Sequence, residues 1–178
     1  MDLIAELFDL CKSHPRPIIA IDGPAGAGKT TLANHLHYAL GATLPSHVIH
    51  MDDLYHGWKT PFDQQFADAL RNLVNAHTSR QDMKLARFDW SSNTYLAPEN
   101  LSPKPLLILE GVASMHSIIG DEISAAIWLE IAPEIGLQRV LERDGAGITD
   151  EMQYWLELQE QHFLAEEPKN RADFILTT

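Results

Sequence analysis

The sequence predicts an α/β fold in which a five-stranded parallel sheet carries helices on both faces. Two observations support this. Short apolar runs typical of buried strands alternate along the chain with longer segments of helical periodicity, and the first run, residues 17–21, leads into a glycine-rich turn and a helix at 31–40. Strands that alternate with helices pair in parallel, because each crossover helix covers a face of the sheet.

The first half of the chain contributes two strands and two further helices. Residues 1–14 have apolar residues at helical spacing, which predicts an amphipathic helix that packs on the body of the protein. A short strand is expected at 47–50, and a helix with one apolar face at 63–76. A short strand at 84–88 follows, and the stretch 89–105 is rich in proline, serine and asparagine, which is typical of irregular loop.

The second half completes the sheet. Residues 106–109 form a strongly apolar strand, and 125–131 read as the next buried strand. A helix is expected from Pro133, a residue suited to a first helical turn, to about Arg143. A second helix follows at 150–166, and a last strand at 172–176.

Composition narrows the class of protein. A chain of 178 residues suits one domain spanning 1–178, and its net charge of −12 disfavours nucleic acid as the partner, because phosphate backbones are held by clustered Lys and Arg. Cys11 is the only cysteine, which excludes an internal disulfide and favours a cytoplasmic setting. Residues 1–14 are acidic and lack the pattern of a secretory signal, and no apolar run reaches membrane-spanning length.

The glycine-rich turn is a complete phosphate-binding loop. Glycines allow backbone conformations in which successive N–H groups turn toward an anion, and the helix that follows adds its positive N-terminal end. Lys29 is placed to reach the terminal phosphates, and the Thr30 hydroxyl to hold Mg²⁺. A chance glycine-rich turn is the alternative, but the flanking strand and helix both disfavour it. We therefore expect ATP and Mg²⁺ to be bound by Gly23, Pro24, Ala25, Gly26, Ala27, Gly28, Lys29, Thr30 and Thr31.

Two acidic residues follow predicted strands. Asp52 comes just after the strand at 47–50, where ligands of open α/β sheets collect, and it is placed to accept a proton from an attacking hydroxyl or to contribute to the metal site. Capping of the following turn is the alternative for Asp52 and the preferred role for Asp53. Glu110 directly follows four apolar residues, and we expect it to order Mg²⁺ or its waters rather than to be a solvated acid.

Arg139 and Arg143 lie four residues apart on one predicted helix face. Intrahelical salt bridges with nearby acids would explain them. The alternative is a lid over residues 134–150, in which Gly145 and Gly147 allow closure and the guanidinium groups meet the transferring phosphoryl group.

Aromatic residues gather in the segment between 55 and 95. Phe62 and Phe66 are four residues apart and are assigned to the core. Trp58, Trp90 and Tyr95 stand among polar residues and are better candidates for the wall of a pocket that takes a flat or ring-shaped acceptor.

In this order, the motifs resemble the uridine kinase and phosphoribulokinase branch of the P-loop kinases over nearly the whole chain after the first helix. The phosphate-binding loop at 23–30, the segment 51–55, the Glu-Gly ending at 110–111, the arginine-bearing helix at 139–144 and the closing strand at 171–175 all match the family's pattern. The resemblance implies a P-loop NTPase fold of the nucleoside-kinase type with a short lid.

The resemblance also implies roles for single residues. Asp52 would be the general base and Tyr55 a substrate-side residue. Asp63 looks like the aspartate that holds ribose hydroxyls, and the segment Phe88, Asp89 and Trp90 is similar to the one that lines the nucleoside pocket. Asn93 stands near the place of the histidine that reads the pyrimidine in uridine kinases. These residues fall in an acceptor-binding region at about 51–104.

The sequence thus predicts an ATP-dependent kinase that phosphorylates a hydroxyl of a small metabolite such as a nucleoside, with Lys29, Asp52, Arg139 and Arg143 as its catalytic residues. Two alternatives stay open. One is a kinase of a non-nucleoside acceptor, of the pantothenate or sugar-phosphate kind, which the asparagine at position 93 favours. The other is a nucleotide-binding switch without kinase activity.

Overall fold

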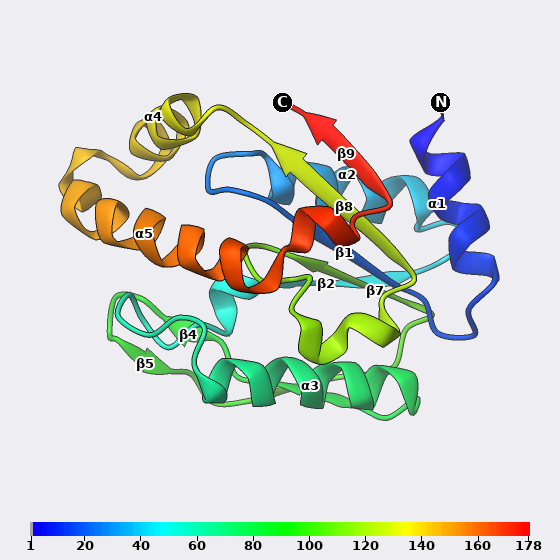
Figure 1. Ribbon diagram of the computed structural model, residues 1–178. Coiled ribbons are helices and arrows are strands. Elements are labelled where there is room, and N and C mark those ends of the chain that lie inside the picture. The colour runs from blue at the N-terminus through cyan, green and yellow to red at the C-terminus, as the bar shows by residue number, and fades with distance from the viewer. Residues whose placement is uncertain (1) are drawn as a thin grey trace.

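A five-stranded parallel sheet forms the centre of the computed structural model, which describes residues 2–178 (Figure 1). Its strands lie in the order β2-β7-β1-β8-β9, and every neighbouring pair is parallel. The expected α/β fold with a five-stranded parallel sheet is therefore confirmed. The strands are β1 (Ile18–Asp22), β2 (Ser46–His50), β7 (Leu106–Glu110), β8 (Ala125–Glu130) and β9 (Phe174–Thr177).

Helices cover both faces of this sheet. Alternation along β1 separates two cores, because Ile19 and Ile21 pack with residues of α1 and α2, whereas Ile18 packs on the side of α3 and α5. Figure 1 shows α3 on the side of the sheet away from α2, with α5 crossing in front. The helices are α1 (Leu3–Lys12), α2 (Lys29–Leu40), α3 (Gln64–Thr78), α4 (Pro133–Asp144) and α5 (Thr149–Glu166). Short 3₁₀ helices occur at Met51–Asp53, Ser117–Glu122, Ala146–Ile148 and Pro168–Arg171.

Local capping sets several of the helix ends. The Asp2 carboxylate accepts from the N–H groups of Ile4 and Ala5 at the start of α1, and Pro133 occupies the first turn of α4. The Asp63 carboxylate caps the start of α3 by accepting from Phe66 N. These contacts satisfy N–H groups that have no partner within a helix.

The expectation of irregular loop throughout 89–105 was partly wrong. Two small antiparallel sheets occupy this region, with β4 (Phe88–Asp89) paired to β5 (Thr94–Tyr95) and β3 (Met83–Leu85) paired to β6 (Glu99–Leu101). The predicted strand at 84–88 is divided between them. Strands of two or three residues are too short to display the alternation by which sequence identifies a strand.

The order of the strands places the glycine-rich loop at the centre of the sheet. From β1 the chain crosses to β2 on one side, while β8 and β9 lie on the other. Ligands bind at such switch points, outside the carboxyl ends of the strands.

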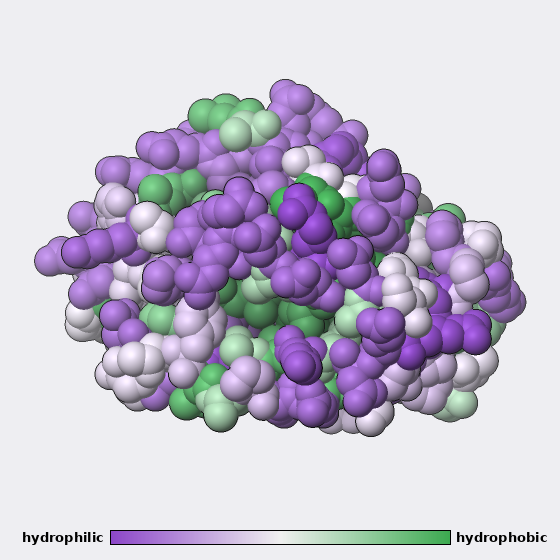
Figure 2. Space-filling view, turned by 90° about the horizontal axis from the view of Figure 1, so that it is seen from below, coloured by the Kyte–Doolittle hydropathy of each residue, from purple (hydrophilic) through white to green (hydrophobic). Residues whose placement is uncertain are grey.

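Seen from below, the surface is largely hydrophilic, with apolar residues gathered in a central hollow (Figure 2). Within residues 2–178, every helix is too short or too polar to cross a membrane.

Candidate active site

The glycine-rich loop enters α2 through left-handed backbone. Gly26 and Gly28 have φ values of 78° and 86°, and Gly28 is the N-cap of α2. Some N–H groups of the loop are hydrogen-bonded within the protein. Gly23 N donates to Asp22 Oδ1 at 2.8 Å, and Ala27 N donates to Pro24 O at 3.2 Å. Within residues 2–178, no acceptor meets the N–H groups of Gly26, Gly28, Lys29 and Thr30. A row of free amides at a helix N-terminus fits an anionic phosphate chain.

Lys29 lies buried against the loop that it follows. Its ammonium group donates to Gly23 O at 2.7 Å and to Pro24 O at 2.8 Å. Burial lowers the pKa of Lys29, whereas the nearby carboxylates of Asp22 and Glu110 raise it. Two backbone carbonyls are weak partners for a buried ammonium, so this side chain is available to a stronger anion such as a phosphate oxygen.

Glu110 ends β7 beside the loop and contacts residues of two other elements. The Thr30 hydroxyl donates to its Oε1 at 2.9 Å, and His50 at the end of β2 bonds to the same oxygen. That hydrogen bond raises the pKa of His50. The oxygens of Thr30, Glu110 and Asp52 are the donor type that Mg²⁺ prefers, so these residues fit the expected metal. In the described part of the chain no three His, Cys, Asp or Glu side chains form a metal cluster by themselves, so the fit requires phosphate oxygens as further ligands.

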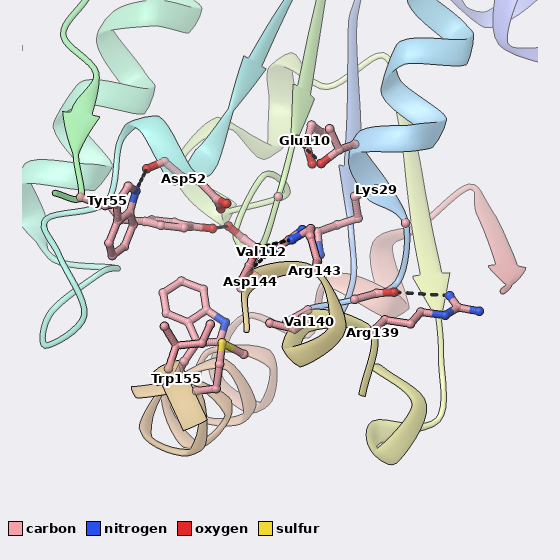
Figure 3. Close-up of a pocket in the computed structure, with 18 of the residues that line it drawn as sticks. Lys29, Asp52, Tyr55, Glu110, Val112, Arg139, Val140, Arg143, Asp144 and Trp155 are labelled. Atoms are coloured by element: carbon pink, nitrogen blue, oxygen red, sulfur yellow. Dashed lines mark hydrogen bonds and ion pairs between the residues drawn. The ribbon is translucent and has the colours of Figure 1, made fainter. Parts of the chain in front are cut away.

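Asp52 extends from the single turn Met51–Asp53 toward the loop (Figure 3). Its carboxylate is exposed to the cavity, yet the surrounding walls desolvate it. This desolvation and repulsion from Glu110 raise the pKa of Asp52, while Lys29, Arg143 and His50 act in the opposite direction. Among residues 2–178 no hydrogen-bond donor meets its carboxylate oxygens. The alternative role as a turn cap is therefore not the role seen here.

A cavity of about 700 Å³ joins Asp52 to the phosphate-binding loop (Figure 3). The loop and α4 form its polar side, with Lys29, Arg139, Arg143 and Asp144 in the lining. The rest of the lining is largely aromatic and apolar, and includes Tyr55, Trp58, Trp90, Val112, Val140, Ile148, Met152 and Trp155. The arrangement can hold a phosphate chain at one end and an apolar ring at the other.

The arm formed by residues 83–101 fastens the Asp52 turn from behind. Arg87 forms ion pairs with both Asp53 and Glu99, and the Trp90 indole N–H donates to Asp52 O at 3.2 Å. The Tyr95 hydroxyl donates to Leu54 O at 2.8 Å. Three side chains of the arm thus fix the backbone that carries Asp52. The Asp53 carboxylate is used in the ion pair with Arg87, and Asp53 does not line the cavity.

Both arginines of α4 reach the cavity lining. Arg143 makes two hydrogen bonds to the carboxylate of its neighbour Asp144, at 2.7 and 2.6 Å, and two thirds of its side chain is exposed. The guanidinium Nη1 of Arg139 donates to Gly26 O of the loop at 3.4 Å. The salt-bridge alternative therefore holds for Arg143 in this form of the protein, and closure of 134–150 as a lid stays a prediction.

Several residues expected on the substrate side make other contacts. Tyr55 borders the cavity, but it is buried and its hydroxyl donates to Val112 O at 2.7 Å. Trp90 lines the cavity, whereas Phe88 packs against Trp90 and Tyr95 beneath it. Asp63 caps α3 and faces a second, smaller cavity.

Asp89 and Asn93 are also absent from the cavity lining. Asp89 accepts hydrogen bonds from Ser91 and Ser92, and Asn93 turns the β4–β5 hairpin with a φ of 54°. Substrate roles for Asp63, Phe88, Asp89 and Asn93 remain predictions that would require the region to rearrange.

Sequence reasoning missed Asp22, Met152 and Trp155. Asp22 ends β1, is fully buried, and accepts from Gly23 N and Met115 N at 2.8 and 3.0 Å. An acid that closes an apolar strand just before the loop was the available signal. Met152 and Trp155 lie three residues apart on the buried face of α5, and nothing local indicates that this face borders a cavity.

Replacement of Gly26 by Ala should be more damaging than the same change at Gly28. Both glycines have positive φ, but a Cβ at Gly26 would lie 2.2 Å from Gly136 O, whereas a Cβ at Gly28 meets nothing within 4 Å. We expect Gly28→Ala to lower the free energy of unfolding by about 1 kcal/mol from backbone strain, and Gly26→Ala by at least about 2 kcal/mol more from the clash. Urea unfolding measures both. Equal losses would contradict the backbone contact between the loop and α4.

Stability should depend on the ionisation of Asp22. Burial raises its pKa from 3.8 to about 6. A carboxyl whose pKa is higher in the folded protein binds its proton more tightly there, so folding loses stability as pH rises from about 4 to about 6. We expect wild type to lose about 3 kcal/mol relative to Asp22→Asn across this interval. Urea unfolding of the pair at matched pH checks this, and a difference that stays constant with pH would contradict it.

The parallel sheet and the loop between β1 and α2 define a P-loop NTPase. The family model of the AAA domain matches residues 12–141, and the chain belongs to this family. No curated protein matches the sequence.

Solved structures share the fold. A possible uridine kinase from Bacillus stearothermophilus is 24% identical with a TM-score of 0.68, over 99% of this chain and 100% of its own. A proposed fructose transport system kinase from Silicibacter is 19% identical with a TM-score of 0.67, over 98% of each chain. A shikimate kinase from Acinetobacter baumannii, in complex with shikimate, is 19% identical with a TM-score of 0.52, over 94% and 87%. The resemblance to P-loop kinases thus extends to the fold.

Proposed function

We propose that the protein is an ATP-dependent kinase that transfers the γ-phosphoryl group to a hydroxyl of a small, uncharged, ring-bearing metabolite, with a nucleoside as the first candidate. One observation carries the proposal. The Asp52 carboxylate faces the same cavity as Lys29 and the loop, with no hydrogen-bond donor on it in the described residues. A protein that only binds nucleotide has no use for a desolvated, free carboxylate between its phosphate site and an aromatic wall.

Each polar residue then has a role in transfer. The acceptor oxygen bonds to the γ-phosphorus while the bond from that phosphorus to the β–γ bridging oxygen breaks, and ADP leaves. Asp52 takes the hydroxyl proton, and its raised pKa makes it a better base near neutral pH. Lys29 and the loop amides hold the phosphates, and Arg139 with Arg143 offset the charge on the transferred group.

Thr30 and Glu110 would hold Mg²⁺ together with phosphate oxygens of ATP, which leaves the Asp52 carboxylate free to act as the base. When bound, Mg²⁺ would neutralise the charge that develops on the phosphate oxygens. His50 hydrogen-bonds to Glu110 and orients that carboxylate.

The composition of the cavity favours an uncharged acceptor. Trp58 and Trp90 pack edge to face with ring centroids 5.0 Å apart, and Trp155 lies 6.1 Å from Trp58. Such a wall suits a ring that stacks or inserts. The cations in the described lining, Lys29, Arg139 and Arg143, all belong to the loop or to α4. None is left for a phosphate already present on the acceptor, which disfavours sugar phosphates.

A coupled assay of ADP release tests the proposal. The purified protein is given ATP and Mg²⁺ with a panel of nucleosides, free sugars, sugar phosphates and vitamin precursors such as pantothenate. Release that depends on an uncharged ring-bearing acceptor, with the phosphorylated product found by mass spectrometry, supports it. Stimulation by a sugar phosphate alone would overturn the acceptor class. ATP binding without acceptor-dependent release would favour the switch.

A further inference from the structure

One backbone N–H of the phosphate-binding loop is hydrogen-bonded to a side chain of a helix far away in the sequence. Ala25 N, in the middle of the loop, donates to Oε1 of Gln159 on α5 at 2.8 Å. The loop's other protein-bound amides, at Gly23 and Ala27, are held by Asp22 and Pro24 within or next to the loop itself. Among the described contacts, Gln159 is thus the acceptor for a loop N–H group that lies outside the loop and the residue next to it.

Gln159 interrupts an otherwise cavity-facing stripe of α5. The buried residues of this helix are Met152, Trp155, Gln159 and His162, which recur at helical spacing. The first two line the large cavity. Gln159 is only 6% exposed, and burial of a primary amide is unfavourable unless it is hydrogen-bonded. An apolar residue would suit the stripe, so the contact with Ala25 is the feature that accounts for glutamine at this position.

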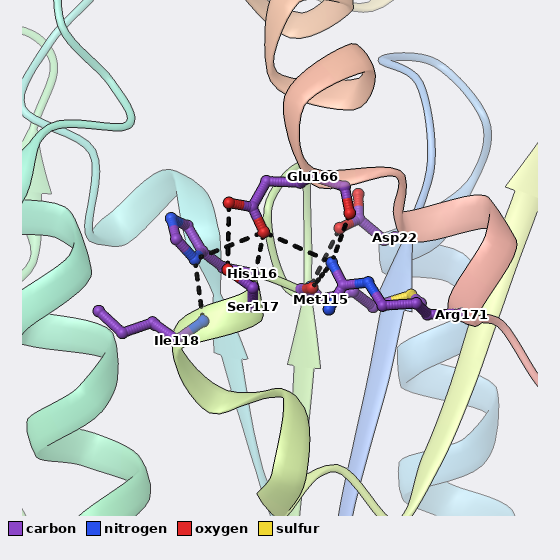
Figure 4. Close-up of polar contacts among 7 residues, drawn as sticks. All are labelled: Asp22, Met115, His116, Ser117, Ile118, Glu166 and Arg171. Carbon is purple, nitrogen blue, oxygen red and sulfur yellow. Dashed lines mark hydrogen bonds and ion pairs between the residues drawn. The ribbon is translucent and has the colours of Figure 1, made fainter.

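The end of α5 beyond Gln159 is held in place (Figure 4). The Glu166 carboxylate accepts from Ser117 N at 2.7 Å, and Arg171 donates to Met115 O at 2.7 Å and to Glu166 O at 2.9 Å. Met115 N in turn donates to Asp22, which holds the first amide of the loop. The helix is therefore fixed to the same frame as β1, and Gln159 presents its carbonyl from a rigid base.

We propose that Gln159 is a positioning residue for phosphate binding, which holds the loop through Ala25 N–H so that the amides of Gly26, Gly28, Lys29 and Thr30 are left for the nucleotide. The partition of the loop supports this, since amides held by the protein alternate with free ones from Ala25 to Gly28. A loop that is already shaped binds its ligand without an ordering penalty. The inference rests on nucleotide binding at the loop, which is part of the proposed function, but not on the identity of an acceptor.

Calorimetric titration with ATP and with tripolyphosphate, each with Mg²⁺, tests the proposal. Gln159→Met keeps the length of the side chain and removes the acceptor, and Gln153→Met makes the same change at an exposed position of α5. We expect Gln159→Met to weaken both ligands by about fivefold, the effect of one lost hydrogen bond, and Gln153→Met to bind as wild type does. In turnover, the KM for ATP should rise while kcat at saturating ATP stays within about twofold.

A measurement on the wild-type protein keeps the proposal testable if Gln159→Met does not fold. In amide hydrogen exchange without ligand, Ala25 N–H should exchange at least about tenfold more slowly than Gly26 and Gly28 N–H, because only the first is hydrogen-bonded. Equal exchange of the three amides, or wild-type affinity in a folded Gln159→Met, would overturn the proposal. A wild-type protein that binds neither ATP nor tripolyphosphate would instead contradict the proposed function.

Discussion

Asp52→Asn should leave ATP binding within about threefold of wild type and lower kcat at least about 100-fold, the usual contribution of a general base. The amide has nearly the same shape as the carboxylate but cannot take the hydroxyl proton. Because no hydrogen-bond donor among residues 2–178 meets the Asp52 carboxylate, its replacement should not disturb the turn, whose backbone stays bonded to Trp90. Single-turnover measurement of ADP formation, with calorimetric titration of ATP, separates the two effects.

Asp53 provides the matched control for this prediction. Asp53→Asn changes the same functional group one residue away, where the carboxylate pairs with Arg87 outside the cavity. We expect this variant to lose less than about tenfold in kcat, since only positioning by the arm is weakened. Comparable losses in the two variants would show that the turn, rather than the Asp52 carboxylate, limits the reaction.

Lys29→Met should remove productive use of ATP altogether. Methionine fills much of the space of the buried lysine stem but donates nothing to a phosphate. Loss of a preorganised donor costs about 100- to 1,000-fold in rate, and loss of phosphate binding adds to it, so we expect kcat/KM for ATP to fall at least about 1,000-fold. Steady-state kinetics at varied ATP measures the change.

The exposed Lys84 is a suitable control for removal of a positive charge. Lys84→Met lies on the arm, away from the loop, and should retain wild-type kcat/KM. If Lys29→Met kept more than about a tenth of wild-type kcat/KM, a phosphate-binding role for Lys29 of the kind seen in P-loop enzymes would be excluded.

The sequence was most informative where the relevant interactions are local. The loop at 23–30 is defined by glycine conformations and by the helix that begins beside it, and all strands of the sheet except β2 by apolar runs. Asp52 and Glu110 could be placed together because carboxyl ends of parallel strands meet at one edge of a sheet. The bonds that join Glu110 to Thr30 and His50 follow from that placement.

Contacts between distant segments could not be predicted in the same way. Gln159 and Ala25 are 134 positions apart, and no periodicity along α5 shows which residue its buried face meets. Local chemistry also competes with function for polar side chains. Asp63 and Asp89 match a substrate-binding pattern in sequence, yet one caps a helix and the other closes a serine-rich turn in this structure.

The close backbone contact between Gly26 and Gly136 sets how α4 is able to move. It fixes the helix near its beginning, so any tilt would pivot there. At a rise of about 1.5 Å per residue, Arg139 lies roughly 4.5 Å along the axis from this fulcrum and Arg143 roughly 10.5 Å. A given rotation therefore carries Arg143 more than twice as far as Arg139. If α4 tilts in this way when the proposed lid closes, Arg139 would stay beside the loop and Arg143 would make the greater displacement.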